Sequence, residues 1–338
     1  MLHKNSLFKQ CCNVYKTQYF YMSKNTNSSM YVFDRTAKKL QKERAIIHPD
    51  SKLADYLKEE VGSRIYDNLI DIKRKFNKIV DLNCGRGYVS KYIDPDMTDE
   101  LILCDSSSLI LDQCEEPKGV KCTKMIVDEE NLPFDPNSID VFLSCLSLHW
   151  VNDLPGSLSQ ILKCLKNDGV LIGSLFGGDT LYELRSSLQL ADLERNGGIS
   201  SHISPFAAVR DIGSLLTMAG YTLLTIDTDE LNVGYPSMFE LMWDLQAMGE
   251  NNASINRCTH LSRDTLLAAA AIYENMYGEP GKIQATFQLI NLIAWKPDPS
   301  QPKPARRGSA EFSLKDLNKL DEIIKEKGFI DLKEKEKK

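Results

Sequence analysis

The stretch Ile79-Val-Asp-Leu-Asn-Cys-Gly-Arg-Gly87 decides the fold, because a short apolar strand there ends in an acid and runs into a glycine-rich turn. Two further predicted strands, Leu101–Asp105 and Thr123–Asp128, also end in aspartate. The carboxyl ends of parallel strands meet at one edge of an open α/β sheet, which is the edge where ligands bind. Glycine in the turn lets the backbone approach a ligand closely. The sequence therefore predicts a nucleoside-binding edge.

Each acid has a distinct expected role at this edge. We expect Asp105 to bind both ribose hydroxyls and Asp128 to accept a hydrogen bond from an adenine amino group. A dinucleotide fold favours the spacing G-x-G-x-x-G, but this chain reads Gly85-Arg-Gly-Tyr-Val-Ser90 and lacks the third glycine. The pattern instead resembles the class I S-adenosylmethionine (SAM) methyltransferase superfamily, in which an acid precedes the first glycine as Asp81 does here.

The resemblance to this superfamily implies SAM as the cofactor. Asn83 stands where superfamily members usually carry glycine, and asparagine tolerates left-handed backbone angles better than most residues. The predicted cofactor-binding residues are Asp81, Asn83, Gly85, Gly87, Asp105, Ser106, Asp128, Glu129 and Leu146.

The order of the predicted elements indicates a Rossmann-like α/β fold. Apolar residues at helical spacing fill residues 34–76, and five strands then follow at 79–83, 100–104, 123–127, 139–146 and 170–176. Strands separated by helix-length connections predict a mostly parallel, doubly wound sheet. Two more strands, near 221–227 and 287–295, complete a predicted seven-stranded sheet.

Long connections and tails divide the predicted chain into parts. Helical insertions are expected after strand five, at 177–205, and after strand six, at 230–284. The predicted SAM-methyltransferase-like domain spans 34–296, and 297–338 is expected to be a proline-rich and charged tail. Residues 1–33 contain four lysines and no acid, a composition typical of a mitochondrial presequence and also compatible with a disordered start.

Composition limits the partner classes and the metal chemistry. The formal net charge is −6, and without residues 1–33 it falls to −10, from 37 basic and 47 acidic residues. This balance argues against a nucleic-acid partner. The nine cysteines form no C-x-x-C pair and no cluster with histidine, so neither a disulfide framework nor a metal site is predicted. No apolar run is long enough to cross a bilayer.

An acidic interval marks the expected substrate side. Between Arg210 and Arg257 there is no lysine or arginine, but there are seven acids. Tyr235, Phe239 and Trp243 recur every fourth residue, so on a helix they would share one stripe beside Glu240 and Asp244. Carboxylates beside aromatic faces suit a guanidinium. The predicted substrate residues are Tyr235, Glu240, Trp243 and Asp244; the alternative is a common amphipathic helix with buried rings and solvated acids.

Longer blocks between about Val32 and Ala310 resemble one family, that of the mitochondrial NADH dehydrogenase (complex I) assembly factor 5. These blocks are Val127–Phe134, Leu143–Pro155, Phe176–Leu190, His202–Phe206, Val233–Met242 and Arg263–Tyr273. The resemblance implies hydroxylation of an arginine in a quinone-module subunit of complex I, alongside other assembly factors. It also implies a place in the mitochondrial matrix, peripherally on the inner membrane. Wider relatives include bacterial malonyl-carrier-protein methyltransferases.

The sequence identifies no definite catalytic set. His149 follows the fourth predicted strand, and it either contacts ligand or is a satisfied histidine beside Trp150. Asp179 and Glu183 follow the fifth strand, where they either meet a cationic substrate or cap the next helix. Three functions stay open at this point: a protein-arginine hydroxylase, a SAM-dependent methyltransferase acting on a protein or carrier-bound substrate, and a non-catalytic chaperone that grips a client subunit.

Overall fold

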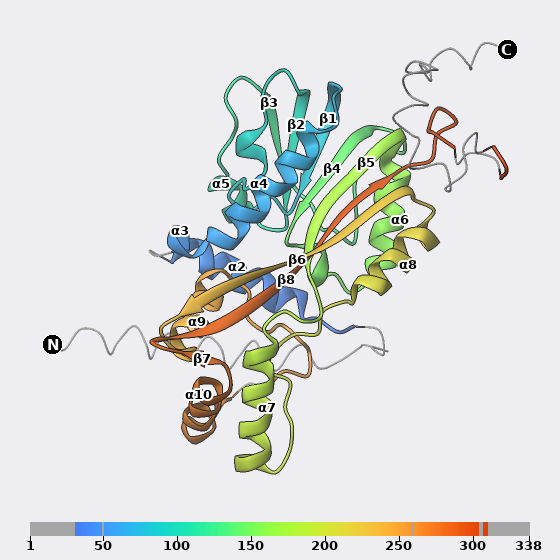
Figure 1. Cartoon of the computed structure of the whole chain (residues 1–338). Coiled ribbons are helices and arrows are strands. Elements are labelled where there is room, and N and C mark those ends of the chain that lie inside the picture. The colour runs from blue at the N-terminus through green and yellow to red at the C-terminus, as the bar shows by residue number, and fades with distance from the viewer. Residues whose placement is uncertain (1–30, 49–50, 259, 304–306, 310–338) are drawn as a thin grey trace, which may run out of the picture. The chain divides into compact units, whose positions relative to one another are not determined.

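The computed structural model describes residues 31–48, 51–258, 260–303 and 307–309. Its centre is a mixed sheet with the strand order β3-β2-β1-β4-β5-β8-β6, and β7 pairs with β8 (Figure 1). The strands are β1 (Phe76–Leu82), β2 (Thr98–Asp105), β3 (Lys121–Ile126), β4 (Ile139–Cys145), β5 (Leu165–Phe176), β6 (Thr222–Tyr235), β7 (Gly278–Glu279) and β8 (Lys282–Trp295).

The sheet is mostly parallel, as the sequence predicts. Strands β1 to β5 pair in parallel, whereas β8 runs antiparallel to both β5 and β6. The two-residue β7 adds an eighth strand to the seven that were expected. The Rossmann-like methyltransferase fold is therefore confirmed.

Helices cover both faces of this sheet. They are α2 (Arg35–Ile47), α3 (Ser51–Ala54), α4 (Tyr56–Ile70), α5 (Ser108–Asp112), α6 (Leu154–Cys164), α7 (Tyr182–Asn196), α8 (Val209–Ala219), α9 (Met238–Ala247) and α10 (Arg263–Tyr277). On one face of the sheet, a core cluster contains residues of α4 and Ile79 of β1. On the other face, a second cluster contains residues of α6 and α8 and Val80 of β1. Since both faces are buried, the central strands are continuous apolar runs.

Strand register brings the expected ligand edge together. Asp81 on β1 pairs with Leu103 on β2 and Leu143 on β4, so these three strands end side by side. The glycine-rich turn, Asp105 and the segment after Cys145 consequently lie at one edge of the sheet.

The last two long strands differ from the prediction. Strand β6 continues to Tyr235 and β8 begins at Lys282, so the connection between them is shorter than the expected 230–284. In Figure 1 these strands extend away from β1–β4 toward α7, α9 and α10. Half-buried and exposed residues alternate along most of β6, which is the pattern of a strand with one face packed on the protein. Glu230, which was expected at the start of the insertion, therefore lies on β6 together with Asp227 and Asp229.

The terminal segments lie largely outside the described residues. These are the predicted presequence up to residue 30 and residues 304–306 and 310–338 of the expected tail. Contacts divide the chain at Asp298, after which Pro299–Lys338 forms a separate unit. Within the part of the chain that the structure describes, no helix is both long and apolar enough to span a membrane.

Candidate functional site

The glycine-rich turn after β1 adopts left-handed backbone angles. The φ angles are 57° at Asn83, 57° at Gly85 and 87° at Gly87. A Cβ atom on Gly87 would lie 2.7 Å from the backbone oxygen of Glu115, so glycine is required there by space as well as by angle. Asn83 carries the left-handed conformation that the sequence led us to expect for a glycine substitute.

Asp105, at the end of β2, is buried but keeps its carboxylate aimed at this turn. It is 1% exposed and accepts hydrogen bonds from the Ser107 backbone N–H (3.2 Å), the Gly85 backbone N–H (3.4 Å) and the Ser106 hydroxyl (3.3 Å). Burial raises the pKa of Asp105, while Lys42 and the two backbone N–H donors offset part of that rise.

A pocket opens where the turn and Asp105 meet. Four predicted cofactor residues line it: Asn83, Gly85, Asp105 and Leu146. The pocket encloses about 40 Å³. Sequence reasoning missed the rest of the wall, most of which comes from α2 to α4, the turn itself and the end of α9. These residues are Lys42, Ala45, Ile46, Ser51, Asp55, Lys58, Arg86, Tyr88, Ile110, Cys145, Ala247, Met248 and Glu250. We refer to it as the cofactor pocket.

Asp81 lies behind this pocket and not in its wall. It is fully buried, and neither carboxylate oxygen has a hydrogen-bond partner. Burial, reinforced by Asp105, raises the pKa of Asp81 to about 8, and the nearby Ser90 N–H offsets this only in part. The cofactor roles of Asp81, Gly87 and Ser106 remain predictions.

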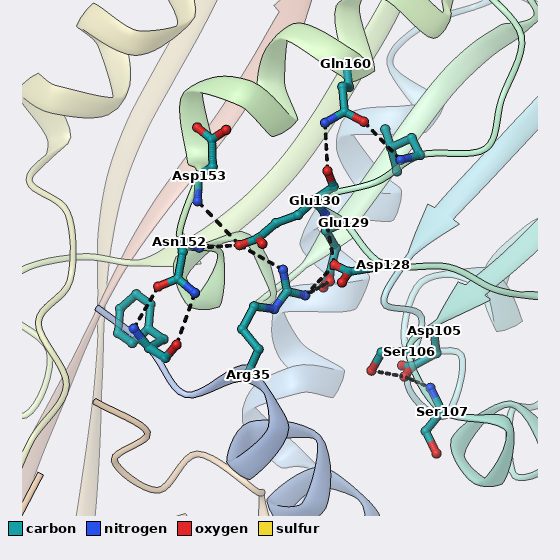
Figure 2. A network of polar contacts seen from close by, with 12 residues as sticks. Arg35, Asp105, Ser106, Ser107, Asp128, Glu129, Glu130, Asn152, Asp153 and Gln160 are labelled. Carbon is teal, nitrogen blue, oxygen red and sulfur yellow. Dashed lines mark hydrogen bonds and ion pairs between the residues drawn. The ribbon is translucent and has the colours of Figure 1, made fainter. Parts of the chain in front are cut away.

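The acids after β3 are held by one arginine. Arg35, from the start of α2, faces Asp128, Glu129 and Glu130 (Figure 2). Its guanidinium nitrogens lie 2.9, 2.5 and 3.0 Å from the carboxylate oxygens of these three residues. The side chain of Glu129 is 7% exposed and that of Asp128 is 55% exposed. Neither Asp128 nor Glu129 lines the cofactor pocket, so their predicted contact with adenine remains a prediction.

The three catalytic candidates occupy different surroundings. His149 is buried against Trp150, Phe176 and Phe206, and its Nδ1 accepts a 3.5 Å hydrogen bond from the Phe176 backbone. Burial lowers the pKa of His149 to about 4, so its imidazole is neutral at pH 7. Asp179 is exposed and accepts from Gln288.

Glu183 is buried on α7 and accepts hydrogen bonds from the hydroxyl and backbone of Thr286. These hydrogen bonds connect α7 to β8, so the Glu183 carboxylate has a structural role.

The expected aromatic stripe does not form. Tyr235 is the last residue of β6 and is buried, with its hydroxyl bonded to that of Tyr56, because β6 runs farther than predicted. Trp243 on α9 is 73% exposed, so the alternative of buried rings is also wrong for this residue. Glu240 accepts from the Ser237 hydroxyl in the first turn of α9. Burial raises the pKa of Asp244, and Tyr56 lowers it in part.

A buried ion cluster was not predicted from the sequence. Glu250 accepts from the Trp150 indole N–H (2.8 Å) and from Lys38 (3.2 Å), and Lys58 lies 3.4 Å away. Lys38 Nζ also lies 3.3 Å from the centre of the Trp150 ring. The only sequence signal was the count of acids that included Glu250, since a buried lysine looks like any solvated one before the protein is folded.

Within the described ranges, no three His, Cys, Asp or Glu side chains gather as a set able to hold a metal ion.

Comparison with known proteins places the protein in a family. Residues 80–173 match the family model described as a methyltransferase domain. The chain is 50% identical over 300 residues to "Arginine-hydroxylase NDUFAF5, mitochondrial" of Danio rerio, which covers 88% of this chain and 93% of that protein. It is 51% identical over 297 residues to the Homo sapiens protein of the same name, covering 88% and 86%. The chain belongs to the NDUFAF5 family.

Solved structures agree on the fold of this NDUFAF5 family member. A putative methyltransferase from Bacillus halodurans superposes with a TM-score of 0.50 at 16% identity, covering 69% of this chain and 99% of that one. At such low identity the likeness concerns the fold alone. The curated NDUFAF5 relatives are named mitochondrial.

Proposed function

We propose that the cofactor pocket binds S-adenosylmethionine. The supporting observation is a buried carboxylate, Asp105, set beside a left-handed glycine-rich turn whose backbone lines the same pocket. Asp105 would accept hydrogen bonds from the ribose hydroxyls, and Gly85 and Asn83 would let the backbone pass close to the ligand. When bound, this cofactor supplies an electrophilic methyl group on a sulfonium.

We further propose that the protein hydroxylates an arginine of a partner protein. The observation that carries this is 50–51% identity over most of the chain to relatives named arginine hydroxylase. Hydroxylation replaces one C–H bond of the arginine with a C–OH group. One atom of dioxygen is inserted, the other leaves as water, and an external reductant supplies two electrons that are matched by two protons.

Methyl transfer is the second candidate, and the methyltransferase family match over residues 80–173 favours it. In that reaction a bond forms between the acceptor atom and the methyl carbon, the carbon–sulfur bond breaks, and the acceptor loses a proton. Holding the acceptor beside the cofactor in the correct orientation contributes up to ~7–11 kcal/mol.

The proposed partner is a quinone-module subunit of respiratory complex I, together with other assembly factors. The proposed place of action is the mitochondrial matrix, at the matrix face of the inner membrane. The mitochondrial place of action is supported by the relatives, which are named mitochondrial. The acidic net charge of −6 disfavours nucleic acid as a partner.

Two measurements test the proposal. Calorimetry with SAM tests the pocket, and absence of binding would refute the cofactor proposal and with it methyl transfer. Mass spectrometry of the client subunit after incubation with the protein then separates the two reactions, because hydroxylation adds one oxygen atom and methylation adds one methyl group. An unmodified client in the presence of SAM, dioxygen and a reductant would overturn both enzymatic proposals.

A further inference from the structure

A second pocket lies beside the cofactor pocket, between α7, α9 and the segments around Ser204 and Asn252. It encloses about 250 Å³. Most of its exposed wall is apolar, and its leucines are Leu181, Leu184, Leu188, Leu245 and Leu261. The two charged residues of the wall are Glu250 and Arg257, and the Arg257 guanidinium is already paired with Asp34 at 3.1 Å. An apolar pocket with few polar groups is the usual form of a ligand site. We call it the acceptor pocket.

Glu250 belongs to the walls of both pockets. Its side chain is 5% exposed, and its two carboxylate oxygens differ in their hydrogen bonding. Oε2 accepts from Trp150 and Lys38, whereas Oε1 is buried and has no hydrogen-bond partner. A buried carboxylate oxygen without a donor costs free energy unless a ligand completes it. A ligand with a hydrogen-bond donor would therefore fit at Oε1, where the two pockets meet.

The positive charges around Glu250 explain why its carboxylate stays ionised without a ligand. Burial alone would raise the pKa of Glu250, but Lys38 and Lys58 bring it well below its usual value, so the carboxylate is ionised. Each lysine makes its shortest bond elsewhere: Lys38 donates to the Gly249 carbonyl and Lys58 to the Met248 carbonyl, both at 2.7 Å. Burial also lowers the pKa of Lys38, and the pairing with Glu250 offsets part of that shift.

Lys58 is the partner that a cationic ligand would replace. It lies 3.4 Å from Oε1 without hydrogen-bond geometry, and its 14% exposed side chain reaches the cofactor pocket. His149 also faces Glu250, at 3.7 Å, but as a neutral ring it adds no charge.

We propose that the acceptor pocket binds an arginine side chain, with its guanidinium at Oε1 of Glu250 and its methylene stem along the leucines. The half-buried ring of Phe206, which also lines this pocket, offers a face for the guanidinium. This assignment rests on the proposed modification of arginine. It moves substrate binding from Glu240 and Asp244 on α9 to a residue just beyond that helix.

The test uses a defined probe, N-acetyl-L-arginine methylamide, added to the full-length protein in the presence of SAM. Saturation-transfer NMR should detect binding of this probe and at least tenfold weaker binding of the citrulline analogue, which has nearly the same shape without the charge. Equal binding of the two, or no binding of the arginine probe to a protein that binds SAM, would overturn the inference while leaving the proposed function standing. A protein that fails to bind SAM would contradict the proposed function itself.

Three variants of the pocket and one surface control make the assignment specific. Glu250→Gln should weaken the arginine probe at least tenfold, while the matched control Glu240→Gln on the surface of α9 should leave it unchanged. Because Glu250→Gln leaves Lys38 buried without its partner, the double variant Lys38→Met/Glu250→Gln removes both charges and guards against misfolding. Leu261→Trp should fill the pocket and abolish probe binding with SAM affinity retained. Unchanged probe binding in the double variant and in Leu261→Trp would refute the site.

Discussion

At the scale of single residues, Asp105 carries the clearest expectation for cofactor binding. Charge-assisted hydrogen bonds to a carboxylate contribute ~1.5–3 kcal/mol each. We therefore expect Asp105→Ala to weaken SAM binding about tenfold to a hundredfold or more, as measured by calorimetry. Asp112→Ala, at the exposed end of α5, is the matched control and should bind SAM normally. Equal affinities in the two variants would remove Asp105 from the site.

Asp81 provides a prediction about pH. Its pKa is raised from 3.8 to about 8, mainly by burial, so the folded protein keeps a proton that the unfolded protein has already lost. Stability therefore falls as the pH rises from about 4 to about 8, by about 1.4 kcal/mol per pH unit from this residue. Asp81→Asn has no such proton. We subtract the unfolding free energy of the natural protein from that of the variant at each pH. This difference should increase by about 3 kcal/mol between about pH 5 and about pH 7.

Urea unfolding of both proteins at the two pH values measures this change. A constant offset from the new amide does not affect the result, because only the pH dependence is compared. Parallel stability profiles would show that Asp81 ionises normally in the folded protein.

At the scale of elements, α2 is the helix whose anchoring matters most for the site. Its first turn is tied to the acids after β3 by Arg35 and to Glu250 by Lys38, and its last turns place Lys42, Ala45 and Ile46 in the cofactor pocket. The wall of the pocket thus depends on ion pairs that lie outside it. Long-range contacts of this kind join residues 94 and 212 positions apart.

Arg35→Met should loosen α2. We expect faster amide hydrogen exchange across Arg35–Ile47 and several-fold weaker SAM binding, because Glu129 would lose the partner that offsets its burial. Arg64→Met, which breaks a more exposed ion pair with Asp229, is the control and should leave exchange in α2 unchanged. Unaltered protection of α2 in Arg35→Met would mean that packing alone holds the helix.

At the scale of the whole molecule, the acid-free segment before Tyr31 carries the prediction about targeting. Among the described residues, Phe33 is the first that belongs to a core cluster, and α2 follows it. We expect a shortened protein starting at Met30 to fold and bind SAM as the full-length protein does. In cells the same shortened protein should remain outside mitochondria. Fractionation with and without the segment measures this, and normal import of the shortened protein would refute the proposed presequence.

The sequence by itself determined the sheet and the location of its ligand edge. The apolar runs that end at Asp81 and Asp105 and the glycines between the two runs are local sequence signals. Because β1 and β2 pair in parallel, the two aspartates come to the same edge of the sheet. Tertiary structure decided the rest. Tyr235 became the end of a strand because β8 pairs along the whole of β6, which no local spacing reveals. Lys38, Trp150 and Glu250 met only through folding, since a buried ion cluster forms between distant segments and each of its residues alone looks like a solvated side chain.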